Sequence, residues 1–358
     1  MHQAVNVVIV GAGINGLCTA WQLAQEFDGA DILVIDRFPS GHSRGSSHGE
    51  ERITRSSYES AHWVAAMLRA QAELWPALEE AVGVPLVHPG PAVFWGPESG
   101  PLPAYAEAVR VAGARVEELD VADARGRFPH MAFPDAERVL VDHHAGVIAA
   151  AQAMRNLEAW LDGHGVRRVV GDVVTLEEDA GGVTVRTDTG TLRCAAVIVC
   201  AGPFVARLVP SFASRVRPAR QSVGFWEMDA EVGRTPEWVH LGADGLHYGL
   251  PTLRGGVMKA ACHAKPLGVD DPEVEVAPDL AALTQVEARL AEWFTPRPGR
   301  RIQADTCFYT NAPDDAFLLE EPPGHTRVLV VSACSGHAFK LAPLTGEAAA
   351  RWAVKTVG

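Results

Sequence analysis

The segment Gly11-Ala-Gly-Ile-Asn-Gly16 follows an apolar run, Val5–Val10, and precedes an amphipathic stretch, Leu17–Phe27. A second apolar run ends at Asp36, 20 residues beyond the last glycine of the motif. The first glycine allows a tight turn, the second lets a pyrophosphate approach the backbone, and the third lets a helix pack closely on a strand. The helix N-terminus then faces the phosphates, and the acid accepts a ribose hydroxyl. This order of elements predicts a dinucleotide-binding fold at the N-terminus.

Composition narrows the class of protein. A chain of 358 residues with 47% apolar and 21% charged residues is long enough for two domains and has an ordinary globular balance. The formal charge of −13 argues against a nucleic-acid partner or an anionic membrane surface. Because the first strand begins at Val5, we expect no secretory leader. We therefore expect a cytoplasmic, monomeric protein that acts on small molecules, without a membrane partner.

Metal sites and disulfides are not expected. The six cysteines show no CxxC or zinc-finger spacing, and Cys18 and Cys200 lie in apolar segments typical of a core. The pair His143-His144 lacks a third ligand at a sensible spacing, so we expect both side chains to be solvated and no metal to be bound.

The hydrophobic pattern predicts an α/β fold with two interleaved domains. We assign residues 1–80, 146–215 and 300–358 to an FAD-binding Rossmann-type domain of the glutathione-reductase kind, and residues 81–145 and 216–299 to a mixed-sheet substrate domain. We expect a loop over 39–57. Expected helices cover 61–80, 102–113, 122–128, 149–161, 280–294 and 343–354. Expected strands cover 89–95, 167–176, 182–187, 191–194, 196–200, 221–226 and 328–331. A dinucleotide fold completed by the C-terminus suits the long cofactor FAD better than NAD.

Four polar segments lie outside the glycine motif. They read His48-Gly-x-x-Arg-x-x-Arg55, Gly256-x-x-Lys-x-x-x-His263, Cys307-x-Tyr309 and Gly336-His-x-Phe-Lys340. Together they resemble the monomeric sarcosine oxidase family, which includes N-methyltryptophan oxidase and pipecolate oxidase, among the D-amino-acid-oxidase-like flavoproteins. The resemblance extends over nearly the whole chain.

The resemblance implies roles for particular residues. Cys307 would carry FAD covalently through a thioether to the flavin 8-methyl carbon, and Lys259 would activate dioxygen beside flavin N5. Arg55 and Lys340 would bind the substrate carboxylate. The planar guanidinium of the arginine and the compact charge of the lysine would together fix the position of the amino acid. The expected catalytic set is Lys259, His263, Tyr248, Tyr309, Arg52 and His48. The expected cofactor-binding set is Gly11, Gly13, Gly16, Asp36, Ser47, His48, Arg52, Val173, Gly202, Cys307, Gly336, His337 and Lys340.

The chain departs from the family at Glu51, where a smaller polar residue is usual, and between 89 and 134, where no match can be read. The sequence thus predicts an FAD-dependent oxidase of a secondary amino acid, N-methylated or cyclic, that forms an imine and reduces oxygen to hydrogen peroxide. A biosynthetic cyclic-amine oxidase and a deglycating oxidase of fructosyl amino acids are alternatives on the same scaffold. A nicotinamide-dependent dehydrogenase and a non-catalytic nucleotide-binding module are more distant ones.

Overall fold

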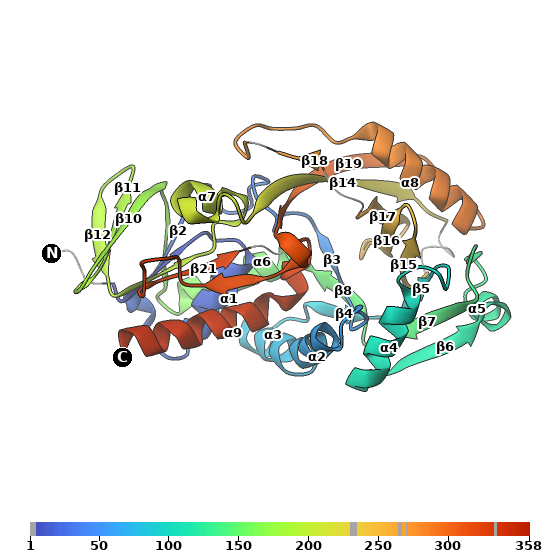
Figure 1. The fold of residues 1–358 in the computed structure, drawn as a ribbon, viewed down its shortest axis with the longest axis horizontal. Coiled ribbons are helices and arrows are strands. Elements are labelled where there is room, and N and C mark those ends of the chain that lie inside the picture. Colours follow the sequence, from blue (N-terminus) through green and yellow to red (C-terminus); the bar gives the residue numbers. More distant parts are fainter. Residues whose placement is uncertain (1–4, 230–234, 264–266, 270, 333–334) are drawn as a thin grey trace.

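The computed structural model of the chain describes residues 5–229, 235–263, 267–269, 271–332 and 335–358. Figure 1 shows an elongated molecule with the C-terminus at one end and a large sheet, with helix α8 over it, at the other. Long strands β14 and β19 run between the two ends.

The first sheet is centred on the apolar strand β1. Within the described residues its order is β20–β21–β13–β1–β2–β9, and every pair except β20–β21 is parallel. The strands are β1 (Val7–Val10), β2 (Ile32–Asp36), β9 (Arg167–Val170), β13 (Ala196–Val199), β20 (Leu318–Glu320) and β21 (Val328–Ser332). All four residues of β1 and of β13 are buried, because central strands of a covered parallel sheet are apolar on both faces.

Alternate residues of β1 face two different layers. Val7 and Ile9 belong to a core with helices α1 (Ile14–Leu23), α6 (Ala150–Gly163) and α9 (Ala338–Val357). Val8 and Val10 belong to a core with the short helix α7 (Val205–Leu208) and an antiparallel sheet of β10 (Val173–Asp179), β11 (Gly182–Thr187) and β12 (Thr191–Cys194). The sheet is therefore covered on both sides, and α1 packs along α9 in Figure 1.

The second large sheet is mostly antiparallel. Its described order is β18–β14–β17–β16–β15–β5–β7–β6, and β19 also pairs with β14. The strands are β5 (Ala92–Trp95), β6 (Val116–Asp120), β7 (Arg138–Asp142), β14 (Arg217–Glu227), β15 (Glu237–Gly242), β16 (Gly245–Pro251), β17 (Val257–Cys262), β18 (Leu267–Gly268) and β19 (Arg301–Asn311). Helix α8 (Leu280–Trp293) covers it through a tryptophan-rich core of Trp95, Trp226, Trp238 and Trp293. Helices α4 (Leu102–Ala112) and α5 (Val121–Arg127) accompany β5, β6 and β7.

A second three-stranded sheet joins the two large sheets. Strand β8 (Gly146–Ala149) pairs with both β3 (Glu51–Thr54) and β4 (Val87–Pro89). Helix α2 (Ala61–Arg69), a π-helical turn (Ala70–Leu74) and helix α3 (Trp75–Val82) connect β3 to β4. Strand β3 carries Arg52 and leads directly to Arg55, two residues of the expected site.

Several elements differ from the sequence-based expectation. The single helix expected over 61–80 is interrupted by the π-helical turn between α2 and α3. The expected loop 39–57 contains strand β3. The expected strand 89–95 is two strands in different sheets, separated by Gly90-Pro91, since proline has no N–H for a sheet hydrogen bond. The expected strand 167–176 is also two, β9 and β10. The last helix, expected from about Pro343, begins at Ala338, so Pro343 lies inside it and not at its first turn.

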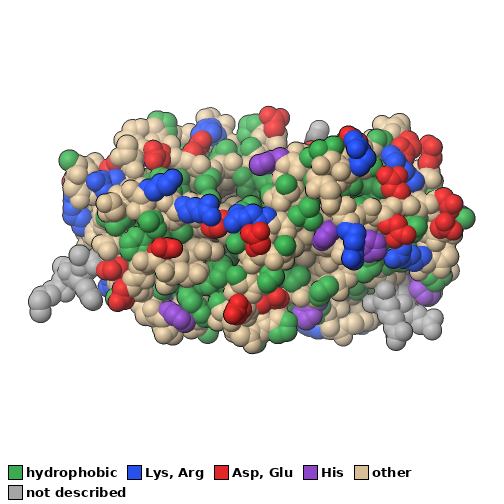
Figure 2. All heavy atoms as spheres, turned by 90° about the horizontal axis from the view of Figure 1, so that it is seen from below, with side chains coloured by type: hydrophobic (Ala, Val, Ile, Leu, Met, Phe, Trp, Pro, Cys, Tyr) green, Lys and Arg blue, Asp and Glu red, His purple; other side chains and the backbone are tan. Residues whose placement is uncertain are grey.

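Surface charges are mixed in sign. Figure 2 shows basic and acidic side chains beside one another over one face of the molecule. Arg138 forms such a pair with Glu98, and Arg168 forms one with Asp162. Ion pairs at the surface each add little stability. Among the described residues, we found no helix with the length and apolar character needed to cross a membrane.

Candidate functional site

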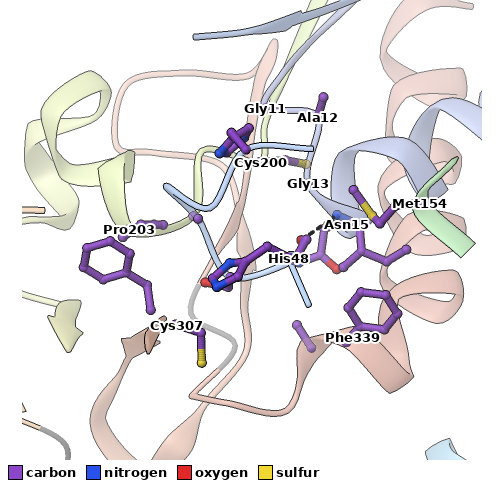
Figure 3. A pocket seen from close by; sticks show the side chains of 18 of the residues that line it. Gly11, Ala12, Gly13, Asn15, His48, Met154, Cys200, Pro203, Cys307 and Phe339 are labelled. Atoms are coloured by element: carbon purple, nitrogen blue, oxygen red, sulfur yellow. Dashed lines mark hydrogen bonds between the residues drawn. The ribbon is translucent and has the colours of Figure 1, made fainter. Parts of the chain in front are cut away.

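The site is a cavity of about 760 Å³ at the junction of the two large sheets and the β3–β8–β4 sheet. This size falls within the range of roughly 300–1,000 Å³ that is usual for ligand sites. Segments from the whole length of the chain line it, and Figure 3 shows the glycine turn, His48, Cys307 and Phe339 around it. Apart from Gly16, every residue of the expected site lies in its wall, so the structure brings the predicted residues together.

The glycine turn has the backbone geometry that its sequence predicts. Gly11 has a φ of +108°, and a Cβ there would lie 2.3 Å from the carbonyl oxygen of Cys200. A Cβ on Gly16 would lie 1.9 Å from the carbonyl oxygen of Gly11, so a glycine is needed there for the turn to pack on the helix. Gly16 itself lies behind the cavity wall. The N–H of Ile14 donates to Ser47 Oγ at 3.0 Å, so the loop of Ser47 lies over the start of α1. This N-terminus can attract a pyrophosphate.

Asp36 is held rigidly at the end of β2. One of its oxygens accepts from the N–H of Ala12 at 2.6 Å and the other from the N–H of Phe38 at 2.8 Å. The carboxylate therefore lies beside the glycine turn, where a ribose would extend from the phosphates. Val173 and Gly202 line the same end of the cavity.

His48 and Arg52 occupy the middle of the cavity wall. Arg52 donates to the main-chain oxygens of Glu51 and Ser46, each at 2.9 Å, and so orders the loop before β3. His48 Nε2 lies 2.8 Å from the carbonyl oxygen of Thr306. Its Nδ1 is buried without a hydrogen-bond partner among the described residues. A buried polar atom in this state is usually completed by a bound group or a water.

Lys259 is buried in the cavity wall on β17. Its Nζ donates to the main-chain oxygen of Glu51 at 2.8 Å. Burial lowers the pKa of Lys259 to about 7, and the guanidinium of Arg52 adds to this effect. The side chain of Glu51 is itself only 3% exposed. Burial raises the pKa of that carboxyl, while Lys259 acts in the opposite direction.

Cys307 lies on β19 opposite Gln221 of β14, and its side chain is partly exposed to the cavity. Lys259 and Arg220 both lie within electrostatic range of the thiol. Cations near a cysteine favour its thiolate, which is the reactive form. The remaining described cysteines are Cys18, Cys194, Cys200 and Cys262, and burial raises the pKa of Cys194 and Cys200 to about 12.

Arg55 and Lys340 converge on the ring of Tyr58. The guanidinium of Arg55 lies 4.3 Å from the ring centre and the Nζ of Lys340 lies 5.9 Å from it. Both cations are at most 5% exposed and both line the cavity. Two fixed, desolvated cations at one place form a strong site for a carboxylate.

Neutral imidazoles and phenols complete this end of the cavity. Burial lowers the pKa of His263 to about 4, and Arg55 and Lys340 add to the shift. Burial and Lys340 likewise hold the pKa of His337 well below its usual value. His263 Nδ1 lies 3.3 Å from the hydroxyl of Tyr309, while burial raises the pKa of Tyr248 to about 12. Both imidazoles are therefore neutral at neutral pH.

Two buried acids behind the site were not recognised in the sequence. Asp142 accepts from the N–H groups of Ser56 and Ser57, both at 2.8 Å, and from their hydroxyls. Arg55 in turn donates to the carbonyl oxygen of Ser57. Glu237 is 2% exposed, and neither of its oxygens has a hydrogen-bond partner among the described residues. Burial and the neighbouring Asp142 raise its pKa well above the usual value.

The pair His143-His144 does not contribute imidazoles to the site. His143 Nε2 lies 3.2 Å from Glu117, and the N–H of His144 donates to Asp142 at 2.9 Å. The residue of that segment that contacts the site is Asp142, which precedes the pair.

The cavity fits a flavin dinucleotide. It offers a helix N-terminus and a fixed acid at one end. An imidazole nitrogen without a partner among the described residues lies in the middle, and a cysteine, a buried lysine and the pair Arg55 and Lys340 lie at the other end. Gly11, Gly13, Asp36, Ser47, His48 and Arg52 would hold the cofactor along this path.

Comparison with known proteins agrees with this geometry. Residues 6–352 match the family described as FAD dependent oxidoreductase. The peroxisomal sarcosine oxidase of Mus musculus is 28% identical over 354 residues, which span 96% of this chain and 90% of the mouse protein. The N-methyl-L-tryptophan oxidase of Citrobacter koseri is 28% identical, over 97% of this chain and 94% of its own. The solved structure of the amino acid oxidase NikD shares the fold, with a TM-score of 0.87, 24% identity, and coverage of 99% and 94%.

Proposed function

This chain belongs to the family of FAD-dependent oxidoreductases, and on that premise we propose that it oxidises a secondary amino acid, N-methylated or cyclic. The observation that carries the proposal is the convergence of Arg55 and Lys340 on Tyr58 inside the cavity. A site with two desolvated cations selects a carboxylate, and relatives 28% identical to this chain are named for N-methyl amino acids.

The protein's part in the reaction is binding, orientation and exclusion of water. Bound FAD supplies the two-electron oxidation of the substrate's C–N bond to an imine. Arg55 and Lys340 hold the carboxylate, and Tyr248, Tyr309 and His263 line the space around the reacting carbon. The two cations and the buried surroundings lower the pKa of the substrate amine, so the nitrogen reacts uncharged.

Lys259 serves the reaction with oxygen. Dioxygen acquires negative charge as it is reduced to hydrogen peroxide, and a fixed cation in an enclosed site stabilises that charge. The hydrogen bond from Lys259 to the main chain of Glu51 fixes the ammonium in place. Cys307 would attach FAD, through a thioether to the 8-methyl carbon, and its place in the cavity lining beside Lys259 supports this role.

The domain assignment follows the same reasoning. Residues 1–80, 146–215 and 300–358 form the part that binds FAD, and residues 81–145 and 216–299 form the part that binds substrate. Segments of one chain complete the cavity, which supports a monomeric enzyme. We propose the cytoplasm as its compartment.

A visible spectrum and a substrate screen test the proposal. The purified protein should be yellow, and a peroxide-coupled assay should respond to N-methyl or cyclic amino acids more than to the corresponding amines without a carboxylate. A preference for fructosyl amino acids would instead favour the deglycating alternative. A colourless protein that binds a nicotinamide cofactor would contradict the proposal.

A further inference from the structure

A second group of chemically reactive side chains lies at the turn between β15 and β16. His240 and His247 are directly opposite each other in this antiparallel pair, and Asp244 lies in the turn between them. Residues opposite each other on paired strands project to the same side of the sheet. One ligand atom from each of the three side chains lies within 4.8 Å of the other two.

Both imidazoles have a nitrogen that needs a partner. His240 and His247 are only 4% and 3% exposed. The Nδ1 atoms of both are buried and lack a hydrogen-bond partner within the described part of the chain. Buried polar atoms are rarely left in this state unless a ligand or water completes them.

The surroundings of His240 are those of a metal-bound histidine. His240 Nε2 lies 3.2 Å from the carboxylate of Asp135, so the ring is held from its far side and Nδ1 is directed to the cluster. A metal-bound histidine usually has such a carboxylate on its other nitrogen. Gly242 leaves the space open, since a Cβ there would lie 2.5 Å from the His240 ring and 2.8 Å from Asp244 Oδ1.

Asp244 can act as the third ligand although it already has a partner. Arg289 contacts Asp244 at 2.8 Å, but it also contacts Glu292 at 3.2 Å. Both members of the Asp244 pair are more than 40% exposed, and exposed ion pairs are weak. Releasing Asp244 would leave Arg289 with its second carboxylate.

We propose that His240, Asp244 and His247 bind a divalent zinc-class ion through two imidazole nitrogens and one carboxylate oxygen. This donor set is typical of Zn²⁺, with water in the remaining position. Ligand bonds of about 2.1 Å require the three atoms to approach by roughly an ångström, and the exposed side chain of Asp244 can make most of that movement.

The site lies behind the substrate cavity. Tyr248 follows His247 and Val239 precedes His240, and both of these neighbours line the large cavity while the imidazoles face the core of α8. Alternate residues of a strand face opposite sides, so the ion would clamp the β15–β16 hairpin from its rear. Its role is to stabilise that wall and not to take part in the oxidation.

Zinc binding tests this proposal directly. Untagged holoenzyme is dialysed against a chelator, then against micromolar ZnCl₂ or MgCl₂, and bound metal is measured per chain together with the melting temperature. We expect one Zn²⁺ per chain, a higher melting temperature with zinc, and no effect of Mg²⁺, which prefers oxygen ligands.

Variants locate the ion. His247→Gln should weaken zinc binding at least 100-fold, and Asp244→Asn, on the exposed turn, about tenfold. His143→Gln is the matched control and should bind like wild type. No zinc bound by wild type at micromolar concentration would overturn the proposal. So would zinc binding that persists in His247→Gln or disappears in His143→Gln.

Discussion

The ammonium of Lys259 on β17 donates a 2.8 Å hydrogen bond to the main-chain oxygen of Glu51 on β3. These two strands belong to different sheets and are more than 200 residues apart in the sequence. The contact closes one wall of the cavity and holds a cation there, 8% exposed. A cation fixed in this way can stabilise developing negative charge without reorganising.

Lys259→Met should therefore slow the reaction with oxygen selectively. We expect reoxidation of the reduced enzyme to slow by roughly 100-fold or more, the size of effect seen when one preorganised electrostatic group is removed. Anaerobic reduction by substrate should change much less. Stopped-flow measurements of the two half-reactions check this. Equal losses in both would assign Lys259 a structural role.

The carboxylate grip predicts a loss of affinity. Arg55→Ala or Lys340→Ala removes one partner of a desolvated charge pair, which costs about 2–5 kcal/mol, or roughly 30- to 4,000-fold in affinity. Titration of flavin absorbance with a small thioether carboxylate measures it. Arg55→Lys should recover only part of the affinity, because the planar fork is lost. Lys355→Ala, on the exposed end of α9, is the control. Unchanged dissociation constants would remove both residues from the substrate site.

Covalent attachment of the flavin has a clear readout. If Cys307 forms the thioether, acid precipitation should leave the yellow colour in the protein pellet, and the intact mass should exceed the sequence mass by about one FAD. Cys307→Ser should release the flavin into the supernatant, whereas Cys262→Ser should behave like wild type. Release of all flavin from wild type would contradict this assignment.

The parts of the fold that depend on residues close together in the sequence could be predicted, and the parts that depend on distant residues could not. The turn at Gly11 and the acid at Asp36 are fixed by local geometry, so their spacing was enough to recognise the dinucleotide-binding unit. Strand β3 was missed because it exists only by pairing with β8, from Glu51 to Ala149, almost a hundred residues away. A polar segment of this kind is indistinguishable from a loop until its partner is known.

The same distinction applies to the site. Arg55, Lys259 and Lys340 were identified through motifs, each a short pattern of residues. Asp142 and Glu237 belong to no such pattern. Ala92 pairs with Glu237 on one side and with Asp142 on the other, so the sheet register brings the two acids into one row behind Arg55. Only the register of three strands shows this arrangement.

Glu237 predicts a pH dependence of stability. Burial and Asp142 raise its pKa in the folded protein, while Arg55 and Lys340 oppose them without reversing the direction. A carboxyl with a raised folded pKa favours folding below its unfolded pKa of about 4.3, and this contribution is lost as pH rises through the folded pKa. Compared with Glu237→Gln, wild type should therefore lose stability with rising pH, by at most about 1.4 kcal/mol per pH unit. Parallel curves in denaturant titrations from pH 5 to 8 would contradict this, and Glu287→Gln, exposed on α8, is the control.

Asp142 is expected to position Arg55 from a distance. Its carboxylate accepts from the N–H groups of Ser56 and Ser57 and is fully buried, and Arg55 donates to the carbonyl oxygen of Ser57. Asn in its place presents one amide group that cannot accept, which leaves a buried donor unpaired at a cost of about 1–3 kcal/mol. Asp142→Asn should lower the free energy of unfolding by this amount.

Asp142→Asn should also weaken binding of the carboxylate inhibitor, because the segment that carries Arg55 loses a hydrogen bond that fixes its position. If reoxidation by oxygen depends on Lys259, as proposed above, its rate should stay close to wild type in this variant. Inhibitor titration and stopped-flow reoxidation of the folded variant, beside Glu107→Gln as an exposed control, separate the two effects. Reduced stability with unchanged inhibitor affinity would show that Asp142 supports the fold alone and that Arg55 keeps its position without it.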